Sequence, residues 1–221
     1  LRDCIARGIQ GHRELVNYRK NGTTYWVELS VVPVRDDRGV LTHWIAIERD
    51  ISDRKAQEKE IERLAMEDHL TGLLNRRAAE ARLEVEWSRA RREKSPFAVA
   101  LVDADRFKLV NDQYGHHVGD QVLIHLARTL ESNLRGGDWI ARWGGEEFLM
   151  CLHGLDARGA VNAGERARKF VKSNPVPIAV GSLPITVSIG IVLYSSQVDS
   201  IEQLLAEADA LLYEAKHTGR D

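Results

Sequence analysis

Two aspartates follow directly after an unbroken apolar run in the middle of the chain. The run extends from Phe97 to Val102 and is typical of a buried strand, and Asp103 and Asp105 come next. A carboxylate at the end of a buried strand costs free energy unless it is paired or holds a cation. The two residues are therefore either ordinary strand-end aspartates or ligands, and the run alone does not distinguish these readings.

A second acidic pair, Glu146 and Glu147, follows the adjacent glycines Gly144 and Gly145. Adjacent glycines favour a tight hairpin and let a ligand approach the backbone closely. If this hairpin lies beside the apolar strand, Asp103 and Glu146 converge as hard oxygen ligands, which a Mg²⁺ ion serving a nucleotide phosphate needs. Alternation along a strand would send Glu146 and Glu147 to opposite faces, so we expect different roles for them.

The composition excludes several classes of protein. The chain has 221 residues, of which 43% are hydrophobic and 29% charged, with a formal net charge of −2. This is enough apolar material for a core, and it gives no bulk attraction for nucleic acid or for a membrane surface. Only two cysteines, Cys4 and Cys151, are present, which argues for a reducing compartment and a cytoplasmic location. A membrane anchor elsewhere in the parent protein stays open.

The elements that must position the acidic residues follow in a clear order from residue 69 onward. We expect helices over Arg76–Lys94, Gly119–Leu130, Ala157–Val171 and Ile201–Ala215, and strands over Phe97–Val102, Asp138–Arg142, Glu146–Leu152 and Ile185–Leu193. From the first strand on, the order β-α-β-β-α-β-α predicts an α+β domain. We expect a mostly antiparallel sheet with helices packed on one face.

The first 68 residues have a different organisation. We expect three hairpin-linked strands over Arg13–Lys20, Tyr25–Val34 and Val40–Arg49, which together would be marginal as a separate domain. A charged helix over Asp50–Asp68 follows, with Ser52 or Asp53 as its cap. Its apolar positions leave two alternatives open, a solvated linker helix or a two-stranded coiled coil.

Several motifs occur in the order of one known family. They are Asp103–Lys108, Asn111-Asp112, Gly115–Asp120 and Arg142–Phe148, bordered by Asp68–Arg77 and by the segment from Ala208 to Arg220. Together they resemble the GGDEF domain of diguanylate cyclases. The resemblance implies a ferredoxin-like, nucleotidyl-cyclase-like domain over residues 68–221, preceded by a signalling linker helix over residues 51–67.

The resemblance implies that two GTP molecules condense to cyclic di-GMP and two pyrophosphates. By similarity, Mg²⁺ is held by Asp103, the backbone carbonyl of Ala104 and Glu146, with two ions per GTP and Mn²⁺ as a substitute. Glu147 is the candidate for deprotonating the attacking 3′-hydroxyl. The cations that would contact the phosphates are Lys108, Lys216 and Arg220. The last two could instead merely complement the dipole of a terminal helix.

The remaining substrate contacts concern the guanine base. By similarity, Asn111 and Asp120 read its edge, because a carboxylate can accept both N–H groups there. Asp120 could instead cap the helix that follows it. Gly145 and Phe107 would lie against the nucleotide. One departure from the family pattern is Arg106, which stands where an aromatic or other apolar residue is common.

Because one domain holds one GTP, the resemblance implies a homodimer with facing half-sites, in which catalysis depends largely on positioning. Arg135 and Asp138 match the family's RxxD inhibitory product site, and Arg166 falls where a second arginine of that site is often found. An Arg fork and a carboxylate could grip the phosphate and guanine of cyclic di-GMP. The alternative is an exposed Arg–Asp ion pair of little consequence.

Residues 1–50 look like the C-terminal half of a PAS domain, nearest the flavin-binding LOV kind. Asn17 matches a flavin-contacting position, but Val27 and Glu48 replace the Asn and Gln expected there, which argues against flavin. This half could instead serve only as a dimerising cap. For the whole chain, the rival to a PAS-regulated enzyme is a catalytically silent GGDEF module that binds GTP or cyclic di-GMP, and a purely structural dimerisation segment is a third reading.

Overall fold

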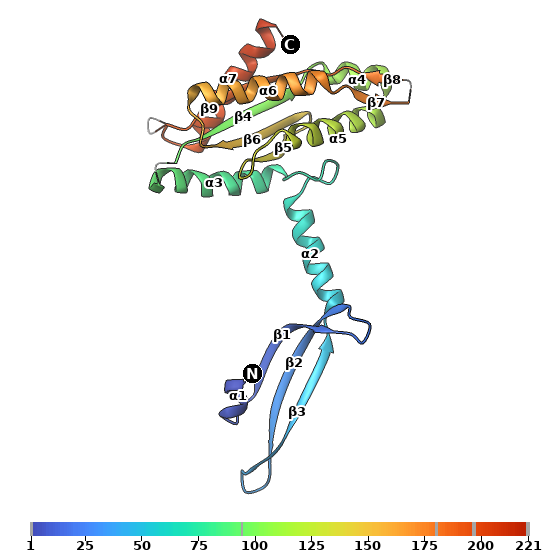
Figure 1. Cartoon of the computed structure of the whole chain (residues 1–221), viewed down its shortest axis with the longest axis vertical. Helices are drawn as coiled ribbons and strands as arrows, with labels where there is room; N and C mark the ends of the chain where they lie inside the picture. Colours follow the sequence, from blue (N-terminus) through green and yellow to red (C-terminus); the bar gives the residue numbers. More distant parts are fainter. Residues whose placement is uncertain (1, 94, 180, 196–197, 220–221) are drawn as a thin grey trace. The chain divides into compact units, whose positions relative to one another are not determined.

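The computed structural model describes residues 2–93, 95–179, 181–195 and 198–219, and the chain divides into two compact units. One unit is Leu1–Arg63 and the other is Leu64–Asp221 (Figure 1). None of the helices in the described ranges combines the length and the apolar character that a membrane span needs.

The N-terminal unit is an antiparallel meander. It contains α1 (Arg2–Ala6), β1 (Gly11–Tyr18), β2 (Thr24–Arg35) and β3 (Leu41–Asp50), paired in the order β1-β2-β3. The three predicted strands are therefore present. β3 has no buried residue, and the buried apolar side chains of the unit are Val27, Val31 and Ile51. The faces of this sheet are largely exposed.

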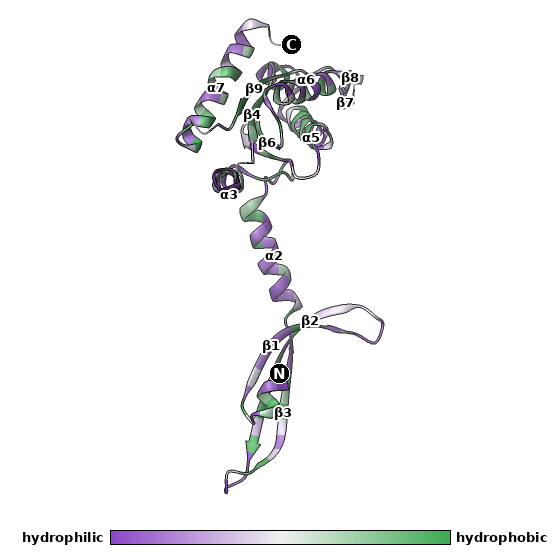
Figure 2. Cartoon of the chain, turned by 60° about the vertical axis from the view of Figure 1, so that its left-hand side comes forward, coloured by the Kyte–Doolittle hydropathy of each residue, from purple (hydrophilic) through white to green (hydrophobic). Residues whose placement is uncertain are grey.

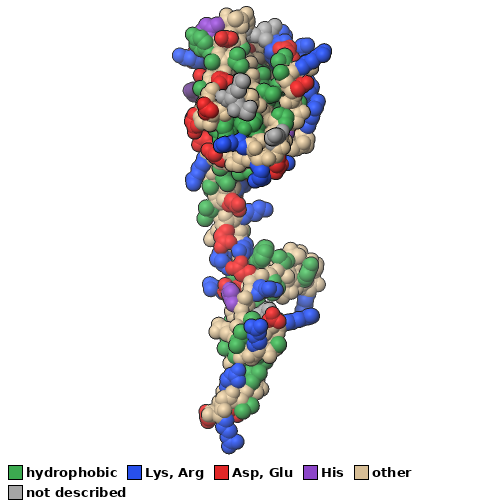
Figure 3. Space-filling model, turned by 90° about the vertical axis from the view of Figure 1, so that its left-hand side faces the viewer, with side chains coloured by type: hydrophobic (Ala, Val, Ile, Leu, Met, Phe, Trp, Pro, Cys, Tyr) green, Lys and Arg blue, Asp and Glu red, His purple; other side chains and the backbone are tan. Residues whose placement is uncertain are grey.

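Helix α2 (Ser52–Met66) begins where the meander ends. Its first turn is capped by Asp50, whose carboxylate accepts a hydrogen bond from the Ser52 N–H at 3.0 Å, rather than by the predicted Ser52 or Asp53. The Ser52 hydroxyl instead accepts from the Trp26 N–H at 3.1 Å, which fixes the helix start to β2. α2 has no buried residue. It is mostly hydrophilic in Figure 2, and acidic and basic side chains alternate along it in Figure 3.

The C-terminal unit is built on a four-stranded antiparallel sheet. Its strands are β5 (Trp139–Gly144), β6 (Glu147–His153), β4 (Phe97–Ala104) and β9 (Val187–Leu193), in the order β5-β6-β4-β9. Its helices are α3 (Arg76–Glu93), α4 (Phe107–Tyr114), α5 (His116–Ser132), α6 (Ala157–Ser173) and α7 (Ile201–Thr218). The predicted α+β class with a mostly antiparallel sheet is confirmed.

The helices lie on both faces of this sheet, so the prediction of one covered face is wrong. α4, α5 and α6 pack on one face, and α3 and α7 pack on the other. All eight residues of β4 are buried, and an unbroken apolar strand of this kind requires cover on both sides. β4 is apolar from Phe97 to Val102, and it is mostly green in Figure 2.

Some elements were not predicted. α4 mixes the polar residues Lys108, Asn111 and Asp112 with apolar ones, and it was not predicted as a helix. α5 begins at His116 instead of Gly119 because Gly115, with φ at 80°, separates the two helices. The short hairpin of β7 (Val176–Ile178) and β8 (Gly181–Leu183) also lacks a strong sequence signal.

The backbone of helix α7 contacts the backbone of β9 at Gly190. A Cβ atom on Gly190 of β9 would lie 2.1 Å from the backbone oxygen of Ala208 and 2.3 Å from the backbone nitrogen of Leu212. Only a residue without a side chain therefore permits this approach of two backbones. The contact fixes the position of α7 along β9, and Lys216 follows one turn after Leu212.

Candidate active site

The glycine hairpin lies beside the end of β4. Asp103 is the register partner of Glu147, and the Ala104 N–H donates to the backbone oxygen of Glu146 at 3.3 Å. Glu146 occupies the tip of the hairpin, because β5 ends at Gly144 and β6 begins at Glu147. The structure therefore places the two predicted acidic motifs next to each other.

Glu146 lies in a partly buried and negatively charged environment. Burial raises the pKa of its carboxyl above the usual value, and the nearby charge of Asp103 raises it further, while Lys216 acts in the opposite direction. Lys216 pairs directly with Asp103, with 2.7 Å between Nζ and Oδ2. Two carboxylates and one ammonium thus meet at one end of the sheet.

The strand pleat assigns Asp103 and Glu147 to the face that α7 covers. Phe97, Val99 and Leu101 of β4 pack on the side of α3 and α7, so alternation places Asp103 on that side as well. Its cross-strand partner Glu147 shares this face. α7, which carries Lys216, covers the same side.

Asp105 has a structural role. Its two carboxylate oxygens accept hydrogen bonds from the Ser188 and Thr186 hydroxyls, both at 2.7 Å, and its N–H donates to the Thr186 oxygen at 3.0 Å. Of the two readings that the sequence left open, the strand-end reading fits Asp105. The next residue, Arg106, has φ 56° and ψ 26°, a left-handed conformation that is uncommon outside glycine.

Arg142 supports the hairpin tip and was not recognised as a site residue from the sequence. Its Nε and Nη2 groups donate to the Gly145 oxygen at 3.1 and 2.9 Å, and its Nη1 group lies 3.1 Å from both carboxylate oxygens of Asp68. Burial raises the pKa of Asp68, but hydrogen bonds from Thr71 and Arg142 outweigh this and lower it overall. Asp68 and Arg142 each begin one of the family motifs in the sequence, and this was the signal that could have identified them as site residues.

The two predicted guanine-reading residues lie on consecutive helices, Asn111 on α4 and Asp120 on α5. A Cβ atom on Gly119 would lie 2.0 Å from Asn111 Oδ1 and 3.2 Å from the Phe107 ring, so Asn111 rests against the residue that precedes Asp120. Phe107 is buried in the core and Asp120 is exposed. The alternative that Asp120 caps α5 is wrong, because the N-cap of this helix is Gly115.

The other predicted substrate residues differ in how they are placed. Lys108 is exposed on the first turn of α4. Gly145 is exposed at the hairpin tip, with open space where a Cβ atom would be. Arg220 lies outside the described residues.

No group of three or more His, Cys, Asp or Glu side chains within the described ranges has metal-site geometry. The candidate metal ligands, the Asp103 and Glu146 carboxylates and the Ala104 carbonyl, form a smaller set. Such a set suits Mg²⁺, which commonly takes one or two carboxylates and completes its octahedron with substrate phosphates and water.

Comparison with known proteins identifies the family. Residues 65–221 match the family model described as "Diguanylate cyclase, GGDEF domain", and residues 1–53 match a PAS domain model. The chain belongs to the GGDEF family.

Among curated relatives, this GGDEF protein is 37% identical over 214 residues to the diguanylate cyclase DgcM of Escherichia coli, a match that covers 96% of this chain and 50% of DgcM. It is 42% identical over 165 residues to the bifunctional diguanylate cyclase/phosphodiesterase MucR of Pseudomonas aeruginosa, covering 74% of this chain and 24% of MucR. The chain thus spans half or less of the length of these relatives.

A solved structure of similar fold is the coiled coil and GGDEF domain of DgcB from Caulobacter crescentus in complex with c-di-GMP. It superposes with a TM-score of 0.72 at 29% identity, and the match covers 77% of this chain and 90% of the solved DgcB chain. The GGDEF assignment and the PAS resemblance predicted from the sequence are therefore confirmed.

The predicted inhibitory residues of this GGDEF domain lie around one turn. Asp138 accepts from the Arg135 N–H at 3.1 Å and from the His153 N–H at 2.9 Å, and Arg135 is exposed. Arg166 of α6 donates to Oδ1 of Asn133 at 3.1 Å, and Asn133 lies two residues before Arg135 in the sequence. Arg135 and Asp138 line one cavity, together with residues of α3 and of the segment before it. No ion pair between the Arg135 and Asp138 side chains is found among the described contacts.

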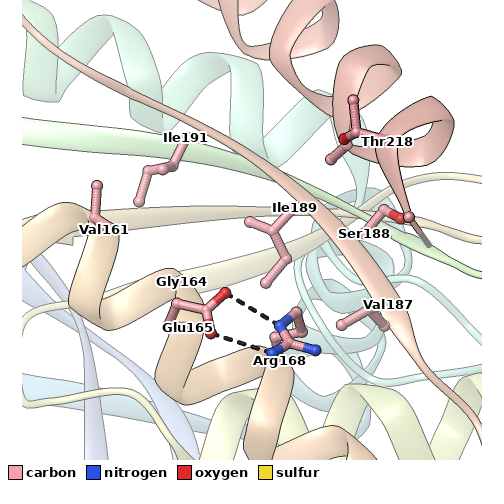
Figure 4. A pocket seen from close by; sticks show the side chains of 11 residues that line it. Val161, Gly164, Glu165, Arg168, Val187, Ser188, Ile189, Ile191 and Thr218 are labelled. Atoms are coloured by element: carbon pink, nitrogen blue, oxygen red, sulfur yellow. Dashed lines mark hydrogen bonds and ion pairs between the residues drawn. The ribbon is translucent and has the colours of Figure 1, made fainter. Parts of the chain in front are cut away.

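A different cavity of the GGDEF domain opens between α6, β9 and α7 (Figure 4). Ile189 and Ile191 face it from β9, and the Glu165–Arg168 ion pair faces it from α6, at 3.1 Å between Glu165 Oε1 and Arg168 Nε. None of the predicted site residues belongs to its described lining. We therefore place the candidate active site at the hairpin and not in this cavity.

Proposed function

We propose that this chain condenses two GTP molecules to cyclic di-GMP and two pyrophosphates. One observation carries the proposal: Asp103, Glu146 and Lys216 meet at one end of the sheet, where burial and mutual charge raise the pKa of Glu146. Carboxylates that repel each other in a partly buried site need a cation, and a GGDEF domain has a nucleotide substrate to supply phosphates to the same ion.

The metal would be Mg²⁺, with two ions per GTP and Mn²⁺ as a substitute. Asp103, the Ala104 carbonyl and Glu146 would hold it, and their hard oxygen donors fit the ion. When bound, it supplies neutralisation of the phosphate charge. Lys216 would share Asp103 with the metal or turn toward the phosphates, and Lys108 and Arg220 would add further positive charge.

The base would be read by Asn111 and Asp120. Asn111 is held against Gly119, so its amide and the neighbouring carboxylate can face one guanine together. Gly145, with open space at its Cα atom, would let the nucleotide lie along the hairpin. Phe107, which is buried in the core, would anchor the first turn of α4 beside the nucleotide. Glu147 is the candidate base for the 3′-hydroxyl, since it shares a face with Asp103.

The catalytic unit would be a homodimer, because each domain holds one nucleotide and the two must attack each other. The PAS-matching segment would regulate it through α2. Glu14 of β1 forms ion pairs with Arg54 and Lys55 at 2.6 and 2.7 Å, which bind the first turn of α2 to the sensor sheet. Asn75 donates to the oxygen of Ala65 at 3.0 Å at the other end of the helix.

Product inhibition would use Arg135, Asp138 and Arg166, which lie around one turn. The bound c-di-GMP in the DgcB structure supports cyclic di-GMP as a ligand of this fold. We also propose a cytoplasmic location, since Cys4 and Cys151 are free thiols.

The test is incubation of the chain with GTP and Mg²⁺, followed by chromatography of the nucleotides. We expect cyclic di-GMP from the wild type and about a hundredfold less or none from Glu146→Gln, which removes one metal-binding charge. Glu207→Gln on the exposed side of α7 is the matched control and should retain activity.

Absence of product at every protein concentration would contradict the cyclase proposal. If the same protein binds GTP or cyclic di-GMP in a calorimeter, the silent regulatory module is the better description. Sedimentation with and without a nonhydrolysable GTP analogue tests the dimer.

A further inference from the structure

A cluster of ionisable side chains links α3 to the turn that contains Asp138. The imidazole of His153, at the end of β6, lies between two carboxylates. Its Nε2 atom is 3.0 Å from Glu86 Oε2, and its Nδ1 atom is 3.7 Å from Asp138 Oδ1. The Glu86 and Asp138 side chains are only 12% and 8% exposed, so both negative charges are largely removed from water.

The hydrogen bonds around His153 depend on its proton. Nδ1 is buried and has no hydrogen-bond partner among the described residues. In a neutral imidazole that donates from Nε2 to Glu86, the Nδ1 lone pair points toward an anion, which is unfavourable. A second proton converts this contact into an ion pair and gives the two carboxylates a shared cation.

The other charged groups around His153 do not replace that cation. On α3, Arg82 lies over the Trp139 ring at 5.1 Å, and Arg89 contributes a further positive charge near Glu86. On β6, the Cys151 sulfur is 4.0 Å from His153 Nε2, and burial raises the pKa of this thiol so far that it stays neutral. Arg82 lines the same cavity as Asp138, but among the described residues neither arginine forms an ion pair with Asp138, whereas His153 lies within 3.7 Å of it.

Asp138 organises the turn that His153 approaches. Its carboxylate accepts from the Arg135 N–H at 3.1 Å and from the His153 N–H at 2.9 Å. Displacement of this carboxylate would therefore release the turn and move Arg135. A positive charge on His153 opposes that displacement, because it attracts Asp138 toward Glu86 and α3.

We propose that protonated His153 is a positioning residue that holds Asp138 against Glu86, and that it thereby makes the affinity of the Arg135–Asp138 turn for cyclic di-GMP depend on pH. The predicted effect on affinity rests on the proposed inhibitory site. The contact of His153 with Glu86 and Asp138, which we call the clamp, does not depend on that site. Product binds more tightly in acid, where the turn is held in place, and more weakly once the imidazole is neutral.

The first experiment is calorimetric titration of cyclic di-GMP into the intact chain at pH 6, 7 and 8, the range in which histidine ordinarily titrates. We expect the dissociation constant of the wild type to rise about fivefold from pH 6 to pH 8, the upper end of the effect of one ion pair near the surface. His153→Gln should bind with the weaker affinity at every pH. His43→Gln, an exposed histidine of β3, should retain the wild-type pH profile.

A second variant separates the imidazole from its partner. Glu86→Gln preserves the size of the side chain and removes one of the two flanking charges, so it should reduce the pH dependence while His153 is present. A wild-type profile that is flat, or one that persists in His153→Gln, would overturn the proposed link between His153 and product affinity.

Failure of the inhibitory site gives a different result. If Arg135→Ala binds cyclic di-GMP as tightly as the wild type, the Arg135–Asp138 turn is not the product site. The clamp itself is decided by urea unfolding between pH 6 and 8. The free energy of unfolding of the wild type should exceed that of His153→Gln by more at pH 6 than at pH 8, because a positively charged imidazole attracts both carboxylates. A pH-independent difference would refute the clamp.

Discussion

The three-stranded sheet of the N-terminal unit and the four-stranded sheet of the GGDEF domain are both antiparallel, yet they differ in how far their residues are buried. No residue of β3 in the N-terminal meander is buried, whereas all eight residues of β4 in the GGDEF domain are. Strand pairing is similar in both, so the ladder itself does not make a core. The difference lies in the covering helices, which enclose both faces of the four-stranded sheet.

This difference also separates two kinds of polar contact. In the N-terminal unit, Glu14, Arg54 and Lys55 form ion pairs with side chains that are 27% to 46% exposed, and pairs this open to water contribute little to stability. In the GGDEF domain, Asp103 and Asp68 have side chains that are 9% and 15% exposed and are held by Lys216 and Arg142. The nearly buried ion pairs are therefore found in the unit whose sheet is covered by helices on both faces.

The largest expected contrast comes from one truncation made in each sheet. Leu149→Ala in β6 removes a side chain that is 0% exposed and should lower the free energy of unfolding by about 2–5 kcal/mol. Ile47→Ala in β3 removes one that is 57% exposed and should change it by less than ~0.5 kcal/mol. Urea unfolding with hydrogen exchange measures both, and equal costs would contradict the contrast.

A second pair of variants tests the close approach of α7. Gly190→Ala should cost about 1–3 kcal/mol, because the new methyl group meets backbone atoms that cannot rotate away. Gly164→Ala in α6 is the matched control, with 3.9 Å to the nearest Ile189 atom, and should be neutral or slightly stabilising. Thermal unfolding distinguishes them, and a tolerated Gly190→Ala would show that α7 is not fixed by this contact.

A third prediction concerns the guanidinium at the hairpin. Arg142→Lys retains the charge but cannot contact both Asp68 and the Gly145 oxygen, so we expect a loss of about 1–3 kcal/mol in stability. Arg128→Lys, an exposed substitution on α5, is the control. Chemical denaturation gives the stability, and an Arg142→Lys protein as stable as its control would show that the network has no structural role.

The smallest expected effect is a difference between the two units in how their stability depends on pH. Hydrogen bonds from Lys55 and Arg54 lower the pKa of Glu14 to about 2, and those from Ser52 and Arg19 lower that of Asp50 to about 2. Their stabilisation is present above the ordinary values of 4.5 and 3.8 and is lost as pH falls toward 2. The raised pKa of Glu146 has the opposite sign, so its contribution to stability increases as pH falls below its raised value.

Hydrogen exchange between pH 6 and pH 3 checks this difference. The first turn of α2 should lose protection in acid, and Glu14→Gln should remove part of that pH dependence. Glu48→Gln on β3 is a suitable control. An unchanged profile in Glu14→Gln would exclude the ion pairs as the cause.

Local patterns predicted much of the GGDEF domain. The apolar run after Pro96 indicated β4, and Gly144-Gly145 indicated the hairpin, so the proximity of Asp103 and Glu146 could be inferred. The polar residues of α4 drew attention away from a helix, although Phe107, Val110 and Tyr114 stand at the i, i+3 and i+7 positions of one helical face.

Contacts between distant residues were not predictable in the same way. Arg142 and Asp68 are 74 residues apart, and no local pattern pairs a particular arginine with a particular aspartate. The same holds for Lys216 and Asp103, and for His153 with Glu86. The two covered faces were indicated by the unbroken apolar character of β4, but we read the element order as a one-sided sheet.

The contact of Gly190 with α7 also has an entropic consequence. Where helices pack through side chains, alternative rotamers give several positions of nearly equal energy. Here the main chain of β9 meets the main chain of α7 directly, so their spacing at Gly190 does not depend on a side-chain rotamer. Pairing Lys216 with Asp103 therefore restricts the freedom of one side chain, while the location of the helix that carries it is already determined by folding.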